Sequence, residues 1–346
     1  MKKKLVGLGL ILSGVLLVAA CGNSDKAKEE EEESYSVALV TDLSGVDDRS
    51  FNQSAWEGLQ EWGKDSNKEK GKGGFNYYEA ATDGEYLPSI NNAINDGFDL
   101  VIGVGFTLQE PIESAADAHQ DTDFVLIDSD IQDKDNVVSV VFNDNEAAYL
   151  AGIAAAKKTQ TNHVGFVGGM EGEVIGRFHA GFVAGVHSID PDIKIDTQYA
   201  GSFGDAAKGK TIASAMYRGG ADVIYHAAGD TGNGIFSEAR DIMNHSQENP
   251  VWVIGVDRDQ EAEGEYKEGN VTLTSTIKAV GVVVEEIAKN AEKGDFPGNE
   301  VLTYGLKDKG VYLADGQLDD DTLGLIKEAE RDIIDGKIEV PTKPKR

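Results

Sequence analysis

The chain alternates short runs of β-branched and aromatic residues with longer stretches in which apolar residues recur every three or four positions. Runs of the first kind are typical of strands, and stretches of the second kind are typical of amphipathic helices. This pattern predicts strands over residues 37–41, 75–79, 100–104, 124–127, 137–142, 164–167, 193–199, 223–225, 251–256 and 271–276. It predicts helices over residues 51–62, 90–94, 111–118, 147–158, 178–187, 206–217, 235–243 and 280–293.

Apolar strands separated by crossover helices predict parallel sheets that are covered on both faces. The predicted strands are too many for one small sheet. We therefore expect an α/β fold of two doubly wound parallel-sheet lobes joined by a hinge. The N-terminal lobe is expected to comprise residues 36–143 and 259–300, and the C-terminal lobe residues 144–258 and 301–346. The expected crossings between the lobes, and therefore the hinge, lie near Asn143, Asp257 and Val301.

The first residues of the chain form a separate segment. Three lysines precede an apolar run over residues 5–20, which is diluted by glycine and serine and falls short of the roughly 20 residues that span a membrane. We therefore predict a signal peptide at residues 1–20, with a short uncleaved anchor as the alternative. The segment resembles a bacterial lipoprotein lipobox. That resemblance implies that Cys21 becomes the mature N-terminus, carries acyl chains, and holds the protein on the extracytoplasmic face of the cell membrane.

Composition limits the ligands, metal sites and partners that the chain can have. Residues 21–34, with glutamate at every position from 29 to 33, lack an apolar pattern, which predicts a solvated tether. The lipobox resemblance implies that this tether is lipidated at Cys21. Because Cys21 is the sole cysteine, the mature domain can form neither an internal disulfide nor a thiolate metal site. The net charge of −29, from 61 acidic and 32 basic residues, argues against a nucleic-acid partner. We expect no cofactor and no metal.

Glycines and charged residues follow several predicted strands. In parallel α/β sheets the carboxyl ends of the strands open onto a crevice where ligands bind. Each such residue also has an ordinary explanation as a turn or a helix cap. The strand-end residues that we select are Asp42, residues 103–106, Asp128, Gly168, Gly169, Gly229, Asp257 and Lys278.

Several motifs together carry a family resemblance. The longest is D-D-R-S-F-N-Q-S-A-W at residues 47–56, supported by shorter motifs at residues 102–106, 164–170, 201–205, 226–234 and 275–278. Over nearly the whole mature chain, the sequence resembles the basic membrane lipoproteins of the purine nucleoside receptor A group. The resemblance implies a type I substrate-binding protein of an ABC importer, a non-enzymatic monomer whose two lobes close on a nucleoside, with purines favoured, and deliver it to a membrane permease.

The resemblance also implies roles for individual residues. Asp42 and Asn52 would hydrogen-bond the base, and Phe51 and Phe203 would stack on it from the two lobes. Gly229, Asp257 and Lys278 would hold the ribose. Phe106 and Asp128 are second-tier candidates, as is Gly232, which can replace Gly229 if the alignment shifts. This set suits the ligand, because a purine offers a flat π surface and a hydrogen-bonding edge, while ribose hydroxyls both donate and accept.

Other function classes stay open at this point. A sugar or autoinducer receptor can share the fold, and a surface interaction protein can keep it with an empty cleft. A nucleoside hydrolase is the enzymatic alternative. Dinucleotide binding is disfavoured because residues 229–234 lack the G-x-G-x-x-G spacing, and the loop over residues 128–139 fails the EF-hand pattern.

Overall fold

The computed structural model describes residues 35–344. The expected signal peptide at residues 1–20, the tether at residues 21–34 and the lipidation site at Cys21 lie outside the described residues. Within residues 35–344, every helix is too short or too polar to cross a bilayer.

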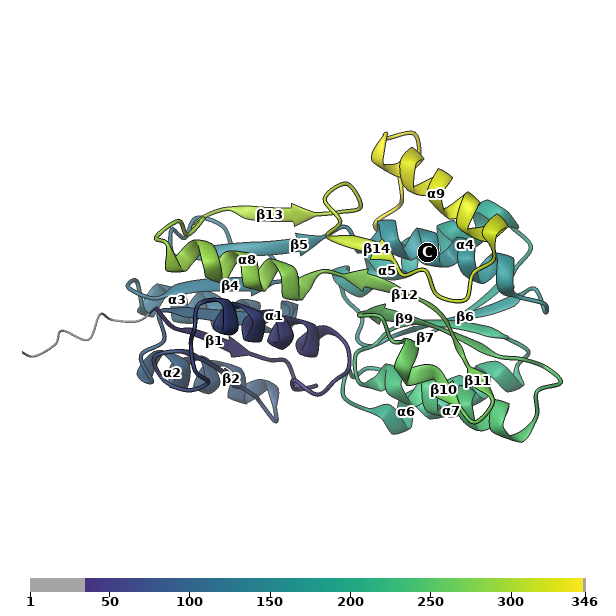
Figure 1. The fold of residues 1–346 in the computed structure, drawn as a ribbon, viewed down its shortest axis with the longest axis horizontal. Coiled ribbons are helices and arrows are strands. Elements are labelled where there is room, and N and C mark those ends of the chain that lie inside the picture. The colour runs from purple at the N-terminus through teal and green to yellow at the C-terminus, as the bar shows by residue number, and fades with distance from the viewer. Residues whose placement is uncertain (1–34, 345–346) are drawn as a thin grey trace, which may run out of the picture. The chain divides into compact units, whose positions relative to one another are not determined.

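The first sheet has six parallel strands in the order β13-β5-β4-β3-β1-β2 (Figure 1). Its strands are β1 (Val37–Val40), β2 (Phe75–Tyr78), β3 (Leu100–Val104), β4 (Asp123–Ile127), β5 (Val137–Phe142) and β13 (Val301–Tyr304). The helices that cover it are α1 (Phe51–Asp65), α2 (Tyr86–Asn95), α3 (Gln109–Ala118) and α8 (Val280–Glu292), with short 3-10 turns η1 (Asp83–Glu85) and η2 (Phe106–Leu108).

The second sheet repeats this order as β14-β12-β9-β8-β6-β7, with only β14 antiparallel among its strands. Its strands are β6 (His163–Gly168), β7 (Lys194–Tyr199), β8 (Val223–Ala227), β9 (Trp252–Asp257), β12 (Thr272–Lys278) and β14 (Val311–Leu313). Its helices are α4 (Asp144–Lys158), α5 (Glu173–Ile189), α6 (Ala206–Arg218), α7 (Thr231–His245) and α9 (Asp320–Ile334). The 3-10 turn η3 (Glu261–Gly264) and the hairpin β10 (Glu265–Tyr266) and β11 (Gly269–Asn270) precede β12.

Alternation along the strands explains the helical layers on both faces. Val37 and Leu39 of β1 join the apolar cluster with α1 and α8, whereas Ala38 and Val40 join the cluster with α2 and α3. Successive side chains of a strand point to opposite faces, so a strand buried on both faces must be apolar throughout. The predicted fold class, two doubly wound parallel sheets, is confirmed.

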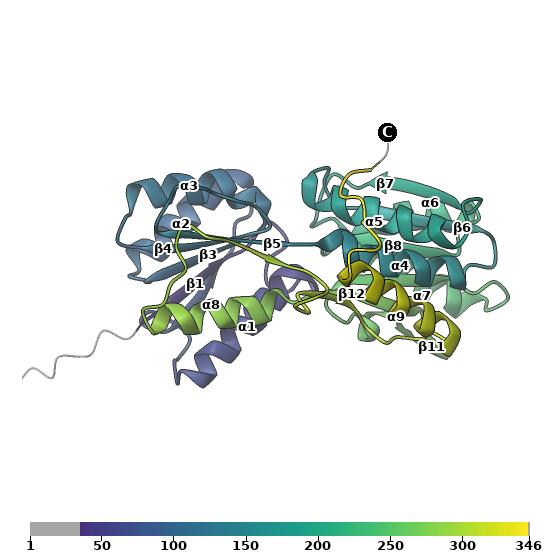
Figure 2. The same ribbon diagram turned by 90° about the horizontal axis from the view of Figure 1, so that it is seen from above.

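The crossings between the sheets differ from two of the expected positions. The chain crosses between β5 and α4, next to Asn143 as expected, then at Ala279 between β12 and α8, and again after β13 (Figure 2). Because β12 pairs with β9, residues 259–278 belong with the C-terminal sheet and not with the N-terminal lobe. Because β13 pairs with β5, residues 301–304 belong with the N-terminal sheet. Pairing between strands that are distant in sequence decides which lobe β12 and β13 join. The hydrophobic pattern within each segment does not indicate its partner strand.

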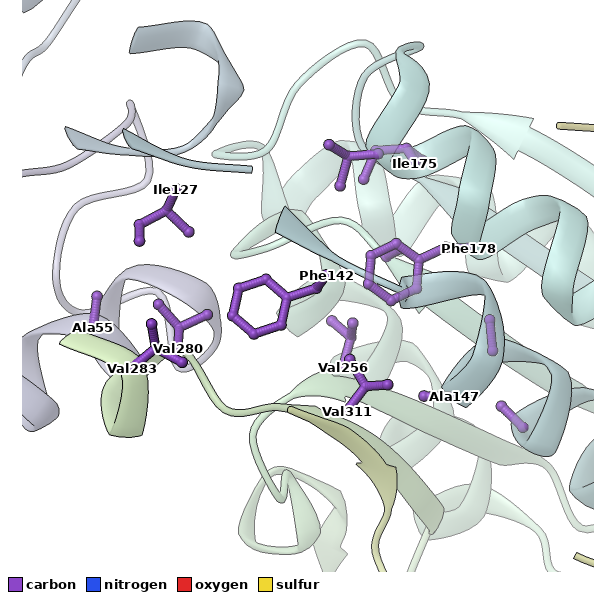
Figure 3. Close-up of a cluster of buried hydrophobic side chains, with 14 of the residues drawn as sticks. Ala55, Ile127, Phe142, Ala147, Ile175, Phe178, Val256, Val280, Val283 and Val311 are labelled. Carbon is purple, nitrogen blue, oxygen red and sulfur yellow. The ribbon is translucent and has the colours of Figure 1, made fainter. Parts of the chain in front are cut away.

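One apolar cluster runs through both lobes. Figure 3 shows Ile127 and Phe142 of the first sheet in the same cluster as Val256 and Val311 of the second and Phe178 of α5. Phe142 is the last residue of β5, immediately before the first crossing. The strand ends of the two sheets are therefore packed around a shared core where the chain passes between them.

Candidate functional site

A cavity lies between the strand ends of the two sheets, with about 510 Å³ of empty space that includes its opening to solvent. The carboxyl ends of the strands are where open α/β sheets bind ligands. Its lining residues are Asp42, Ser44, Asp48, Phe51, Gly105, Phe106, Thr107, Asp128, Val174, Ile175, Phe178, Phe203, Ala227, Ala228, Gly229, Val256, Asp257 and Lys278.

Most residues expected from the sequence meet at this cavity. Those that line it are Asp42, Phe51, Gly105, Phe106, Asp128, Phe203, Gly229, Asp257 and Lys278. Asn52 and Gly232 are not among the lining residues. Gly232 lies in α7, where an added Cβ would come within 2.1 Å of the His226 ring, so this glycine serves the close packing of α7 on β8.

Asn52 lies next to the cavity and positions the carboxylates there. Its Nδ2 donates to Oδ1 of Asp42 and to Oδ2 of Asp48, at 2.8 and 2.9 Å, and its Oδ1 accepts from the backbone N–H of Asp42. Both ends of the amide are therefore engaged within the N-terminal lobe. Burial raises the pKa of Asp42 to about 6, although the hydrogen bonds from Ser44 and Asn52 act in the opposite direction.

Asp257 is held from the opposite lobe. The Ser50 hydroxyl donates to Oδ2 of Asp257 at 2.5 Å, and both residues are buried. Burial raises the pKa of Asp257 to about 7, and the nearby Lys278 and the Ser50 hydrogen bond only partly oppose that shift. Near neutral pH this carboxyl is therefore present in both protonation states, so it can donate a hydrogen bond as well as accept one.

Lys278 is a buried cation that lines the cavity. Its Nζ lies 2.5 Å from Oδ1 of Asp128 and 3.1 Å from Oδ1 of Asp144, and Arg177 pairs with the other oxygen of Asp144 at 3.0 Å. Burial alone would lower the pKa of Lys278, but Asp128, Asp144 and Asp257 together raise it above its usual value. The lysine therefore stays charged, as a buried ammonium with several carboxylate partners does.

Aromatic rings surround the same space. The ring centroids of Phe51 and Phe178 lie 5.1 and 5.7 Å from Nζ of Lys278, close enough for cation–π attraction. Phe106 and Phe203, from opposite lobes, meet edge to face at 6.1 Å. Phe203 also packs on Gly169, where a Cβ would stand 2.2 Å from the ring, so the selected glycine after β6 makes room for an aromatic wall. Flat rings and buried charges together suit a ligand with a π surface and several hydroxyls.

Sequence reasoning overlooked several lining residues. Asp48 lies inside the D-D-R-S-F-N motif but had no assigned role, and Ser44 and Thr107 follow the ends of β1 and β3. Val174 and Ile175 were missed because α5 begins at Glu173, five residues before the predicted start. Phe178 lies inside the predicted helix but was not given a role in the site. Their spacing of three to four residues on one helix face, directly after the β6 strand end, is the signal that identifies them.

Comparison with known proteins agrees with this geometry. The model of the family described as ABC transporter substrate-binding protein PnrA-like matches residues 35–343. An ABC transporter nucleoside-binding protein of Lactococcus lactis is 48% identical over 99% of this chain and 100% of its own length. A CD4+ T-cell-stimulating antigen of Listeria monocytogenes is 47% identical with the same coverage. Among solved structures, a solute-binding protein of an ABC transporter system from Aeropyrum pernix superimposes with a TM-score of 0.80 at 26% identity, covering 90% of this chain and 94% of its own.

Proposed function

Because this chain belongs to the PnrA-like family of ABC transporter substrate-binding proteins, we propose that its interlobe cavity captures nucleosides, with purine nucleosides preferred. The protein is a transporter binding protein and not an enzyme. The observation that carries the proposal is the meeting of Phe51 and Phe203 with Asp42, Asp257 and Lys278 around one cavity lined by both lobes.

The base is proposed to lie between the rings of Phe51 and Phe203. Stacking on an aromatic side chain contributes roughly 1–3 kcal/mol per base. Asp42 then faces the hydrogen-bonding edge of the base, and Asn52 holds Asp42 in place through its amide. Phe106, which contacts Phe203, closes the same wall from the N-terminal lobe.

The ribose is proposed to lie against Asp257, Lys278 and Gly229. Ribose hydroxyls both donate and accept, which suits a carboxyl with a pKa of about 7 beside a charged lysine. Asp128 contributes mainly by holding Lys278. The backbone of Gly229 adopts φ +55°, a left-handed conformation that glycine takes without strain.

Binding is expected to close the lobes, because the ligand would contact both of them and so favour the closed form. The three crossings after Phe142, at Ala279 and after Tyr304 would be the hinge. The closed form would then deliver the ligand to a membrane permease. Both walls of the cavity belong to one chain, which is sufficient for a monomer to function.

Titration calorimetry with guanosine, inosine, adenosine, cytidine, uridine and free ribose tests the ligand class. We expect purine nucleosides to bind at or below micromolar Kd, and nucleotides to bind more weakly, because a phosphate would meet Asp42, Asp48 and Asp257. Tighter binding of a nucleotide than of its nucleoside would overturn the site chemistry. Mass spectrometry of a copurified ligand that proved to be a sugar would favour the sugar-receptor alternative.

Membrane attachment through acyl chains on Cys21 is a separate proposal. Its support is the short apolar run followed by two alanines and the sole cysteine. Metabolic labelling with a radioactive fatty acid should mark the wild-type protein and leave Cys21→Ser unlabelled and released into the soluble fraction. Labelled Cys21→Ser protein would rule out this attachment site.

A further inference from the structure

Three consecutive residues of the N-terminal lobe each bond to the C-terminal lobe. The carbonyl oxygen of Asp48 accepts from Nδ2 of Asn233 at 3.1 Å, and the carbonyl oxygen of Arg49 accepts from Nε2 of Gln260 at 3.0 Å. The hydroxyl of Ser50 donates to Asp257. These bonds join the loop before α1 to α7, to the segment after β9, and to the end of β9 itself.

The Gln260 side chain is fixed from within its own lobe. Its Oε1 accepts from the backbone N–H of Val256 at 2.9 Å and lies 3.1 Å from Nε2 of His226. Burial lowers the pKa of His226 to about 4, so this histidine is neutral and its Nε2–H donates. With both acceptor positions of Oε1 used, the amide nitrogen must face the other lobe, where it meets the Arg49 carbonyl.

The loop that receives these bonds also orients a wall of the cavity. The Asp48 carboxylate accepts from the backbone N–H groups of Ser50, Asn52 and Gln53 at 2.9 to 3.0 Å, which ties the loop to the first turn of α1. Phe51 begins that helix and lines the cavity. These bonds lie within the N-terminal lobe, so they hold the loop and Phe51 in place whether or not the lobes meet.

From this arrangement we infer that Asn233 and Gln260 form an interlobe clasp with residues 48–50 that sets the free energy of closure independently of the ligand. Neither Asn233 nor Gln260 lines the cavity, so they are positioning residues. When a binding-competent state is only partly populated, the apparent Kd of every ligand is divided by the same closed fraction. The clasp thus scales affinity for all ligands equally, whereas cavity residues set the preference among them.

The inference rests on the proposed closure around a ligand, so its test includes a measurement without ligand. Gly204 lies next to the main chain of Leu43 in the other lobe, where a Cβ on Gly204 would be 3.6 Å from the Leu43 carbonyl oxygen, and neither residue lines the cavity. A Leu43→Cys/Gly204→Cys pair, placed in a Cys21→Ser background, can form a disulfide only when the lobes meet. Its oxidation rate in ligand-free protein therefore reports the closed fraction, even when that fraction is small.

Asn233→Ala and Gln260→Glu each remove one clasp donor, and each should slow disulfide trapping by about 2- to 12-fold, the range expected for one hydrogen bond. Without the cysteine pair, each should raise the Kd of guanosine and of cytidine by that same factor. Asn244→Ala is the matched control, because it makes the same change on the same helix at an exposed site, where the side-chain oxygen accepts from the backbone N–H of Lys267 in its own lobe.

Unchanged trapping rates in both clasp variants would overturn the inference. A change of more than about threefold in the ratio of the guanosine Kd to the cytidine Kd would also overturn it, because it would show that these residues contact the ligand. If neither nucleoside binds the wild-type protein, the proposed function fails, while the trapping rates still decide the clasp. If Gln260→Glu does not fold, the Asn233→Ala result decides it alone.

Discussion

Asp128 and Asp257 occupy the same topological position in the two lobes, and each bonds across to the other lobe. Both stand at the end of the fourth strand of their sheet in chain order, and both adopt a left-handed backbone with φ of +71° and +67°. Asp128 pairs with Lys278 of the C-terminal sheet, and Asp257 accepts from Ser50 of the N-terminal lobe. The repeated fold thus places one carboxylate from each lobe at the interlobe cavity, and aspartate tolerates the backbone that this position requires.

The buried ion network predicts a large stability effect at Lys278. Lys278→Met leaves the buried carboxylates of Asp128 and Asp144 without this cation and should lower the free energy of unfolding by about 3–5 kcal/mol. Urea denaturation followed by circular dichroism measures the loss. Lys210→Met, which removes an exposed ammonium from its pair with Asp241, is the control and should cost less than about 1 kcal/mol. Equal losses in the two variants would contradict the assigned role of the network.

The raised pKa values of Asp42 and Asp257 predict that ligand-free protein loses stability as the pH rises from about 4 to about 7. Their folded-state pKa values of about 6 and about 7 lie above the unfolded value of about 3.9. In that window the folded state holds more protons than the unfolded state, so the free energy of unfolding falls with pH and levels off above about 7.

Urea denaturation at pH 4.5 and pH 8 checks this sign. Asp257→Asn keeps a residue that tolerates positive φ and should reduce the fall, by roughly 1.4 kcal/mol for each pKa unit that it removes. Asp319→Asn is the control, because asparagine also caps α9 and the pKa of Asp319 is lowered, which confines its effect to acid below this window. A fall that persists unchanged in Asp257→Asn would show that other groups cause it.

Replacing Phe51 or Phe203 by alanine should weaken nucleoside binding while the protein still folds. Phe51→Ala and Phe203→Ala each remove roughly 1–3 kcal/mol of stacking, which corresponds to about a 5- to 150-fold increase in the Kd of guanosine. Calorimetry measures the change. Tyr312→Ala removes a half-exposed ring outside the cavity lining and should leave the Kd within about twofold. Wild-type affinity in both phenylalanine variants would move the base away from these rings.

Gly169 is expected to control the position of Phe203. A Cβ at residue 169 would lie 2.2 Å from the Phe203 ring, so Gly169→Ala must displace that ring and should raise the Kd of guanosine by roughly 10-fold. Gly324→Ala on α9 is the control, since no atom of residues 35–344 lies within 4 Å of its added Cβ. It should leave the Kd unchanged and raise helix stability by up to about 1 kcal/mol. An unchanged Kd in Gly169→Ala would show that the Phe203 position does not depend on this glycine.

Local pattern was enough to predict most elements but not the last part of the chain. The strands β13 and β14 and the helix α9 were not predicted. β13 is only half covered, with Val301 exposed, and α9 begins after an aspartate cap at Asp319 in a stretch with few apolar residues. Short, half-exposed strands and a mostly polar helix give weak periodicity, so their formation depends on the neighbours that they cover.

The residues of the candidate site were likewise predicted only in part. Strand-end position and motif resemblance identified Asp42, Phe51, Asp257 and Lys278, because the carboxyl ends of parallel strands must meet at one edge. They could not identify that Asn52 is turned toward Asp42 and Asp48, or that Phe178 joins the cavity wall from α5. The direction of a side chain and the exact residue at which a helix begins both depend on packing. A single sequence does not show that packing.

By itself, the sequence determined the class of fold, the two-lobed organisation and the chemical character of the cavity, because hydrophobic period and strand-end chemistry are local properties. Only the tertiary structure decided which lobe β12 and β13 join and which carboxylate Lys278 pairs with. The same holds for the bonds from Asn233 and Gln260 to the carbonyl oxygens of Asp48 and Arg49. Every residue has a main-chain carbonyl oxygen, so the sequence does not indicate which of these oxygens accepts a hydrogen bond. Such contacts form only when the folded lobes bring distant segments together.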